Sequence, residues 1–353
     1  MNLIFFEFAT ASGIEDPSIF SEGLAMLKAL IQDFQDIKAH YLISNKLNFF
    51  NEKNRDTSPL KPIIIEDSIW DWLNENIYKF DACLFIAPEE DYTLYKLTDL
   101  IERKGVKILG SNSKAVKICS DKYKTYKLIK DKVPIIKTDK IYFNQLNTSK
   151  ELDKLFSSNT KKIIKPADGV SCSGVYMVNS YKQLKRCAAR IDNNLPYFIM
   201  QNYIEGVSCS VSLLSNGKNS VSLSLNAQNI IKDNGFGYSG GYVPLNHRLS
   251  QKARDIAEKT VESIPGIKGY VGVDLILNDK VHVVEVNSRI TTPYIALTKI
   301  INFNLGKAII NSVNGKLPEK ILLNGIRFFE KKGDNLEIYE NPNNRQQYDK
   351  WDN

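Results

Sequence analysis

Apolar and polar positions over residues 1–115 follow the pattern of an open parallel α/β sheet. Residues 3–8 form an apolar run, broken only by Glu7, of the kind that fills a buried strand. Asp16 and Pro17 predict the start of a helix, because Asp caps free backbone N–H groups and Pro favours the first turn. The apolar residues of that helix recur every three or four positions: Phe20, Leu24, Leu27, Ile31 and Phe34. Further strands are expected at 40–43, 63–65, 82–87 and 106–109, with helices at 69–77 and 92–103, so the alternation predicts an N-terminal parallel α/β domain.

The remaining residues divide into a small central unit and a larger sheet-rich unit. A helix is expected after Ser113, through ICSDKYKTYKLIK, ending before Pro134. The strand KIIKP, the loop ADGVSCSG, the strand VYMV and a helix over 181–191 complete a central unit at 116–197. Strands dominate 198–325, with helices at 253–263 and 294–313, and residues 326–353 are expected to form a polar tail.

The composition is that of a globular enzyme rather than a membrane or nucleic-acid-binding protein. Of 353 residues, 43% are hydrophobic and 25% are charged, and no apolar stretch approaches the roughly 18 residues of a membrane helix. We therefore expect a cytoplasmic protein without a membrane partner. Five scattered cysteines indicate reduced thiols rather than a zinc site. The net charge of +7 is spread along the chain among acidic residues, so it indicates a polyanionic small ligand such as ATP and no nucleic-acid partner.

Two strands near the C-terminal end of the sheet-rich unit carry a candidate metal site. The Asn-Asp dipeptide at 278–279 predicts a tight hairpin, because both residues tolerate positive φ. A two-residue loop places Asp274 opposite Val283, on one face with Glu285 and Asn287. Two diagonal carboxylates and an amide oxygen suit magnesium, which takes its other oxygens from phosphates and water. A surface strand with polar residues facing water is the commoner interpretation of an isolated Glu-x-Asn.

Upstream residues supply the cations and the backbone that a triphosphate needs. Lys165 ends an apolar strand, and Lys122 lies in the helix that precedes it in the chain. The loop that follows Lys165 can turn backbone N–H groups toward phosphate oxygens, and its candidate residues are Gly169, Ser171, Ser173 and Gly174. Each signal is weak alone: Lys122 is one of four lysines between 122 and 130, and the loop could be a plain hairpin turn.

The motifs SDKYKT, KPADGVSCSG, QNYIEG, GVDLI and EVNSR, in this order from 120 to 292, resemble those of the ATP-grasp superfamily. The resemblance implies a mixed α/β and α+β fold, with a parallel N-terminal domain, a small central lid domain and a sheet-rich C-terminal domain. It implies ATP with Mg²⁺ or Mn²⁺ as cofactors. The roles it implies are phosphate binding by Lys122, Lys165 and the glycine-rich loop, adenine binding by Gln201, Asn202, Tyr203 and Ile204, metal binding by Asp274, Glu285 and Asn287, and acyl-phosphate binding by Arg289. Ser208 stands where a ribose-binding glutamate is usual in the family.

A narrower resemblance concerns the substrates. The segments FFEFATASG, GYSGGYVPLNH and EVNSRITTPY, and the pair Glu22 and Gly23, look similar to the tyramine-glutamate ligases of methanofuran biosynthesis. This implies ATP-dependent amide formation between glutamate and tyramine, giving γ-glutamyltyramine through an acyl phosphate. The implied substrate-binding residues are Glu7, for an ammonium group, and Tyr238, Gly240 and Gly241, for the acceptor. A carboxylate facing water at a strand end and a glycine-rich surface turn are the plain alternatives.

Two other functions stay open from the sequence. A ligase of the same fold could use another amino acid or a peptide, and a nucleotide-binding regulator could respond to ATP without turnover. The three presumed metal ligands and Arg289 favour an enzyme. A homodimer is compatible with the sequence, which carries no signal for the oligomeric state.

Overall fold

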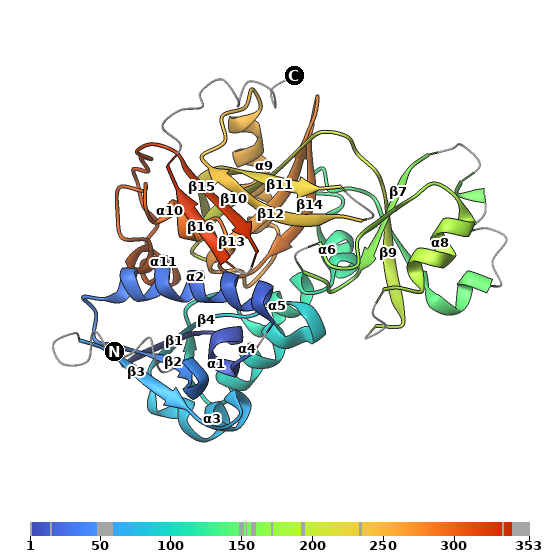
Figure 1. Ribbon diagram of the computed structural model, residues 1–353. Coiled ribbons are helices and arrows are strands. Elements are labelled where there is room, and N and C mark those ends of the chain that lie inside the picture. Colours follow the sequence, from blue (N-terminus) through green and yellow to red (C-terminus); the bar gives the residue numbers. More distant parts are fainter. Residues whose placement is uncertain are drawn as a thin grey trace.

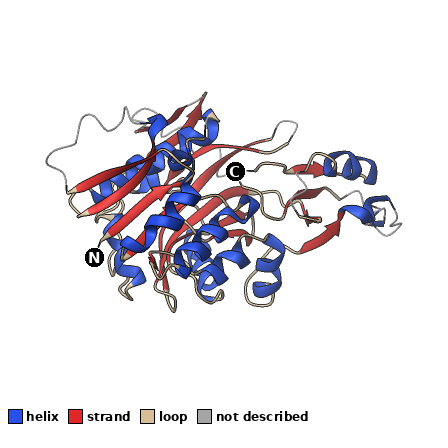
Figure 2. Ribbon diagram, turned by 90° about the horizontal axis from the view of Figure 1, so that it is seen from below, coloured by secondary structure: helices blue, strands red, loops and turns tan. Residues whose placement is uncertain are grey.

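The computed structural model describes residues 2–14, 16–47, 59–147, 152, 154–156, 160–170, 172–191, 195–232, 235–333 and 335–340. In these residues the chain forms three sheets, each packed against helices (Figure 1). Figure 2 shows the small central unit projecting from one end of the molecule. Within the same ranges, every helix is too short or too polar to cross a membrane.

The N-terminal unit is the predicted open parallel sheet, with the strand order β3-β2-β1-β4-β5. Its strands are β1 (Leu3–Glu7), β2 (Ala39–Ser44), β3 (Leu60–Ile65), β4 (Ala82–Ile86) and β5 (Lys107–Ile108). Its helices are α1 (Phe8–Ser12), α2 (Pro17–Phe34), α3 (Ile69–Asn76) and α4 (Thr93–Arg103), with the 3₁₀ turns η2 (Ile77–Lys79) and η3 (Glu90–Tyr92). β1 is buried along its whole length, which explains its apolar run.

The helix predicted after Ser113 is broken. Instead of one helix, the chain forms α5 (Ser113–Cys119) and α6 (Lys122–Ile129). The Asp121 carboxylate caps α6 by accepting the backbone N–H groups of Tyr123 and Lys124 at 3.0 and 3.1 Å. The break makes Lys122 the first residue of α6, and its backbone N–H donates to the Ala167 carbonyl at 2.9 Å. A capping aspartate therefore positions a candidate phosphate-binding lysine beside the glycine-rich loop.

The central unit is a sheet with the strand order β6-β9-β7-β8. Its elements are β6 (Thr138–Tyr142), η4 (Phe143–Asn147), β7 (Lys162–Pro166), β8 (Tyr176–Val178), α8 (Tyr181–Ala188) and β9 (Tyr197–Asn202). Ile164, Leu184 and Phe198 are fully buried and form part of its core. Because β9 pairs with β6 and β7 as far as Asn202, this unit extends past the boundary expected at 197.

The C-terminal unit is an antiparallel sheet with the strand order β14-β13-β10-β11-β12-β15-β16. Its strands are β10 (Val207–Ser215), β11 (Ser220–Ile231), β12 (Gly237–Val243), β13 (Gly269–Leu277), β14 (Val281–Asn287), β15 (Arg327–Lys332) and β16 (Asn335–Tyr339). Its helices are α9 (Ser250–Glu262), α10 (Tyr294–Leu297) and α11 (Leu305–Val313). Figure 1 shows α2 lying along this sheet, so the N-terminal and C-terminal units share one core.

Two sequence predictions for this unit were wrong. The single helix expected at 294–313 is divided into α10 and α11. The first part of the tail expected at 326–353 is folded, because β15 pairs with β12, and β16 pairs with β15. The fully buried Phe329 anchors β15 to the shared core of the two terminal units. Residues 341–353 of the expected tail lie outside the described residues.

Candidate active site

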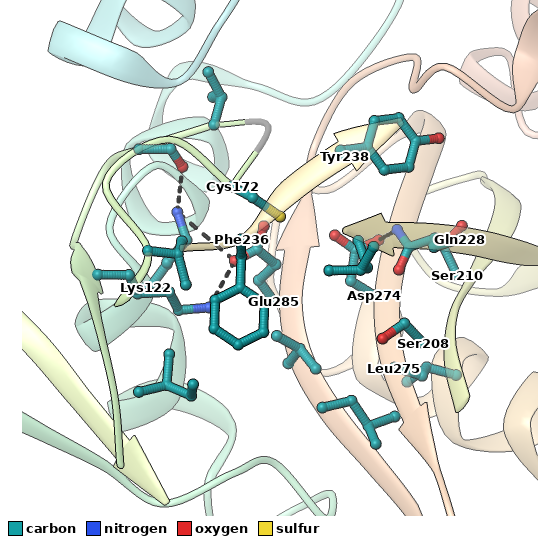
Figure 3. A pocket seen from close by; sticks show the side chains of 18 of the residues that line it. Lys122, Cys172, Ser208, Ser210, Gln228, Phe236, Tyr238, Asp274, Leu275 and Glu285 are labelled. Carbon is teal, nitrogen blue, oxygen red and sulfur yellow. Dashed lines mark hydrogen bonds and ion pairs between the residues drawn. The ribbon is translucent and has the colours of Figure 1, made fainter. Parts of the chain in front are cut away.

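A cavity lies where the central sheet faces the C-terminal sheet, with a contribution from α2 (Figure 3). Most of the residues singled out in the sequence line it: Lys122, Lys165, Gly169, Ser173, Gln201, Asn202, Tyr203, Ile204, Ser208, Tyr238, Asp274, Glu285, Asn287 and Arg289. The cavity lining does not include Glu7, Gly174, Gly240 or Gly241. Ser171 lies outside the described residues. Residues spread over much of the chain thus converge on one cavity.

The β13–β14 hairpin has a different register from the predicted one. Its loop spans 278–280, one residue longer than expected, and a bulge follows between Asp274 and Leu275. Asp274 is therefore the direct cross-strand partner of Glu285, not its diagonal neighbour. Val283 pairs with Leu275, and both belong to the buried core on the other face. The predicted convergence of the two acids is confirmed, but the bulge, and not a two-residue turn, brings it about.

The Asp274 carboxylate is partly buried and held by two amides. Asn287 donates through Nδ2 to Asp274 Oδ2 at 3.1 Å, and Gln228 donates through Nε2 to Oδ1 at 3.1 Å. Burial and the neighbouring charge of Glu285 raise the pKa of Asp274 to about 7. A divalent cation would relieve this repulsion between the two carboxylates.

The set of oxygens suits a cation that shares its ligands with phosphate. In the described residues, no group of three or more His, Cys, Asp or Glu side chains is arranged so that these side chains alone could hold a metal ion. Asp274, Glu285 and the amide oxygen of Asn287 could hold Mg²⁺ or Mn²⁺ only in part. Such partial coordination is usual for Mg²⁺ at a nucleotide, because phosphates and water complete the shell.

Two lysines, Lys122 on α6 and Lys165 on β7, meet Glu285 across the cavity. Lys165 Nζ lies 3.0 Å from Glu285 Oε2, and Lys122 Nζ lies 3.7 Å from the same oxygen (Figure 3). Lys122 Nζ also donates to the Gly169 carbonyl at 2.5 Å. Burial alone would raise the pKa of Glu285, but the two ammonium groups lower it to about 2. Glu285 is therefore ionised and linked to both candidate phosphate-binding lysines.

The glycine-rich loop folds back onto the end of β7. Gly174 has φ +66°, and a Cβ there would lie 2.9 Å from Pro166 Cγ, so this position requires glycine although it does not line the cavity. Gly169 and Ser173 do line it, together with Cys172. The loop thus brings backbone groups to the cavity beside Lys122 and Lys165.

The end of β9 presents backbone to the cavity while its side chains are engaged elsewhere. Gln201 donates through Nε2 to Thr138 Oγ1 at 2.8 Å and is buried. Asn202 Oδ1 accepts from Lys162 Nζ at 2.6 Å. Residues 201–204 all line the cavity. Ser208, on β10, the next strand along the chain, lines the same cavity.

Arg289 is oriented by Glu89, a residue that the sequence analysis missed. Arg289 Nε lies 2.9 Å from both Glu89 carboxylate oxygens, and Nη2 lies 2.8 Å from Oε2. Burial would lower the pKa of Arg289, but the Glu89 charge raises it above its usual value. Glu89 follows the carboxyl end of β4, and the general rule that ligands approach this edge of a parallel sheet could have identified it.

Glu7 does not face water and does not reach the cavity lining. Its carboxylate caps α1 by accepting the backbone N–H groups of Ala9 and Thr10 at 3.0 and 2.9 Å. Burial raises the pKa of Glu7 to about 7. A Cβ at Gly23 would lie 2.3 Å from Glu7 Oε2, so Gly23 allows α2 to pass directly over this carboxylate. Glu7 therefore supports the start of the N-terminal helices.

The segment around Tyr238 is a strand rather than the surface turn considered as its alternative. Tyr238 lies on β12 and lines the cavity. Gly240 has φ +135°, and Cβ atoms at Gly240 and Gly241 would lie 2.1 and 2.0 Å from the carbonyl oxygens of Phe329 and Ala227. These two glycines let neighbouring strands approach closely and do not line the cavity.

Other residues of the lining escaped the sequence analysis. They include Gln228, Lys232 and Phe236. Gln228 continues the polar alternation of β11 after Ser224 and Asn226, so the period of two could have placed it on the cavity face. Glu22, which the narrower resemblance named without giving it a role, also lines the cavity.

Comparison with known proteins places this geometry in a family. A family model described as an ATP-grasp domain matches residues 119–293, and one described as a pre ATP-grasp domain matches residues 52–116. The chain is 38% identical over 294 residues to a tyramine–L-glutamate ligase of Methanocaldococcus fervens, covering 82% of this chain and 87% of the relative. It is 36% identical over 320 residues to the same-named ligase of Methanocaldococcus jannaschii, covering 89% and 90%.

The fold of a solved structure superposes on nearly the whole chain. An ATP-grasp superfamily protein from Archaeoglobus fulgidus superposes with a TM-score of 0.70 at 27% identity, covering 97% of this chain and 99% of that one. The agreement extends over all three units and therefore over the cavity between them. The chain belongs to the ATP-grasp family of ATP-dependent ligases.

Proposed function

We propose that the protein joins L-glutamate to tyramine by an amide bond, using ATP and releasing ADP and phosphate. The observation that carries the proposal is the convergence of Lys122 and Lys165 on Glu285, opposite Asp274, in one cavity. The substrates are those named for the two relatives at 38% and 36% identity. The family assignment supports ATP, with a divalent cation, as the energy source.

In this proposal, the end of β9 binds one end of ATP and the two lysines bind the other. Backbone groups of 201–204 would bind the adenine, and Ser208 would contact the ribose. Lys122, Lys165 and the glycine-rich loop would bind the phosphates through charge-assisted hydrogen bonds. As the lysines turn to phosphate, Glu285 becomes available, with Asp274 and Asn287, to hold Mg²⁺ or Mn²⁺. The cation would offset the negative charge of the phosphates.

The reaction then proceeds in two transfers. A substrate carboxylate oxygen attacks the γ-phosphorus of ATP, the bond to the β-phosphate oxygen breaks, and an acyl phosphate and ADP form. The neutral amine of tyramine next attacks the acyl carbon, and inorganic phosphate leaves as the amine loses its proton. Arg289, fixed by Glu89, is placed to offset the charge of the acyl phosphate and of the departing phosphate.

The acyl phosphate must be kept from water until the amine arrives. The central unit and its glycine-rich loop close one side of the cavity, and their backbone can move toward bound phosphate. Tyr238 and Phe236 line the same space, and their rings are suited to pack against an aromatic amine.

The test is a reaction of the purified protein with ATP, a divalent cation, L-glutamate and tyramine, with each substrate alone as a control. ADP is measured, and the product is identified by mass. The amide should form only when both substrates are present. ADP release without amide would contradict these substrates and direct the search to another amino acid or a peptide. Nucleotide binding without ADP release under every substrate condition would favour a regulator.

A further inference from the structure

A second charged pair reaches the cavity through one of its members, Glu22, and takes no part in the nucleotide site described above. Glu22, on α2, lines the cavity together with Arg289 and Tyr238. Its Oε2 lies 2.7 Å from Lys331 Nζ, on β15, and its Oε1 accepts the hydroxyl hydrogen of Thr292. The two charged side chains are largely buried, with exposed fractions of 14% for Glu22 and 18% for Lys331.

The pair lies outside the nucleotide-binding core of the family. The family models match residues 52–116 and 119–293, so neither includes Glu22 or Lys331. The pair instead joins the first long helix to a strand near the end of the chain, and Figure 1 shows α2 lying along the sheet that contains this strand. A feature that borders the cavity but is absent from the common ATP-binding core is placed to select a substrate.

A contribution to the stability of the fold does not by itself explain why this ion pair is present. A buried pair loses hydration that its mutual attraction only partly returns, so apolar residues in the same place would serve packing equally well. Glu22 lines the cavity, and the ammonium group of Lys331, which does not itself line it, lies 2.7 Å from the Glu22 carboxylate, so the two charges stand side by side next to the cavity. That arrangement is complementary to a molecule with an ammonium and a carboxylate group on one carbon atom.

We infer that Glu22 and Lys331 bind the α-ammonium and α-carboxylate groups of the amino-acid substrate. The inference rests on the proposed function and assigns the residues that select the carboxylate donor. Thr292 fixes the Glu22 carboxylate and also hydrogen-bonds Tyr238, which keeps the anionic group turned to the cavity. With its α-carboxylate engaged by Lys331, glutamate presents its side-chain carboxylate to Arg289 and the phosphates.

Two analogues test the pair one charge at a time. Glutarate lacks the α-ammonium group of glutamate, and 4-aminobutyrate lacks the α-carboxylate. The wild-type protein should prefer glutamate over both. In Glu22→Gln the KM for L-glutamate should rise at least about tenfold, which corresponds to the loss of one charge-assisted contact, and the preference over glutarate should shrink by a similar factor. In Lys331→Met the preference over 4-aminobutyrate should shrink instead.

The control uses the neighbouring exposed ion pair of the same hairpin. Lys332 Nζ lies 2.8 Å from Glu337 Oε2, with exposed fractions of 53% and 51%, and Lys332→Met should leave every constant within about twofold of wild type. The KM values for ATP and tyramine should also stay within that range in all three variants. Thermal unfolding of each variant checks that the fold is retained.

Three results would overturn the inference. One is an unchanged KM for glutamate in both cavity variants. Another is a rise in the KM for tyramine instead, which would assign Glu22 to the acceptor amine. The third is a wild-type protein that binds no α-amino acid in calorimetry with ADP and Mg²⁺. Failure of the proposed function gives a different result, because the wild type then binds an amino acid but forms no amide with tyramine. In that case, calorimetry with that amino acid on the wild type and the two cavity variants tests the roles of Glu22 and Lys331 directly.

Discussion

Lys165 Nζ and Glu285 Oε2 lie 3.0 Å apart and join the central sheet to the β13–β14 hairpin across the cavity. Their side chains are only 8% and 21% exposed, so the contact is shielded from water. The contact links the candidate phosphate site to the candidate metal site. When a triphosphate binds with its cation, an anionic phosphate can take the place of Glu285 beside Lys165. The cation can then take the place of Lys165 beside Glu285.

Replacing either partner should abolish ligation without unfolding the protein. We expect Lys165→Ala and Glu285→Ala each to lower kcat/KM by about 10³-fold, since each removes a charge that contacts ATP or its metal ion. ADP release and amide formation measure the loss, and circular dichroism checks the fold. Lys127→Ala, at an exposed position on α6, is the matched control and should retain wild-type turnover. Wild-type turnover in either cavity variant would refute the assigned roles.

Glu89→Gln should impair the chemical steps more than nucleotide binding. The substitution removes the charge that orients Arg289, so kcat should fall about 10- to 100-fold while the KM for ATP stays within about twofold. Steady-state kinetics with saturating glutamate and tyramine separates the two constants. Glu66→Gln, at an exposed position, serves as the control. A changed KM for ATP with unchanged kcat would show that Glu89 acts on the nucleotide instead.

Gly240→Ala should destabilise the C-terminal sheet. The added Cβ would lie 2.1 Å from the Phe329 carbonyl oxygen at φ +135°, so we expect a loss of about 3 kcal/mol in the free energy of unfolding. Gly237→Ala on the same strand is the matched control, because its Cβ would meet no atom within 4 Å. Urea unfolding compares the two variants, and equal midpoints would mean that β12 shifts to accept the methyl group.

The stability of the protein should depend on pH through Glu7. Its pKa rises from 4.5 to about 7 on folding, so the folded state binds the proton more tightly than the unfolded state does. This contribution is fully present below pH 4.5 and is lost as the pH rises through 7, by about 3 kcal/mol. Glu7→Gln should remove that part of the slope. Urea unfolding of both proteins from pH 4.5 to 8 tests this, and parallel curves would contradict it.

Local patterns determined the N-terminal sheet and the order of the site motifs. Buried parallel strands are continuous apolar runs, and β1 and β4 could be recognised without knowing their partners. The acids of the β13–β14 hairpin were also predicted to meet. Their actual register depends on a bulge that leaves Val284 without a cross-strand partner, and no local propensity specifies which residue a strand will leave unpaired.

The amino-acid sequence by itself thus identified most of the candidate nucleotide and metal residues that line the cavity, because these residues lie in compact motifs whose spacing reflects backbone geometry. Only the tertiary structure decided what surrounds them. Glu89 reaches Arg289 from another domain, and Lys331 reaches Glu22 from a strand that looked like a polar tail. Such pairs arise from the packing of segments far apart in the chain, and packing leaves no periodic trace in either segment.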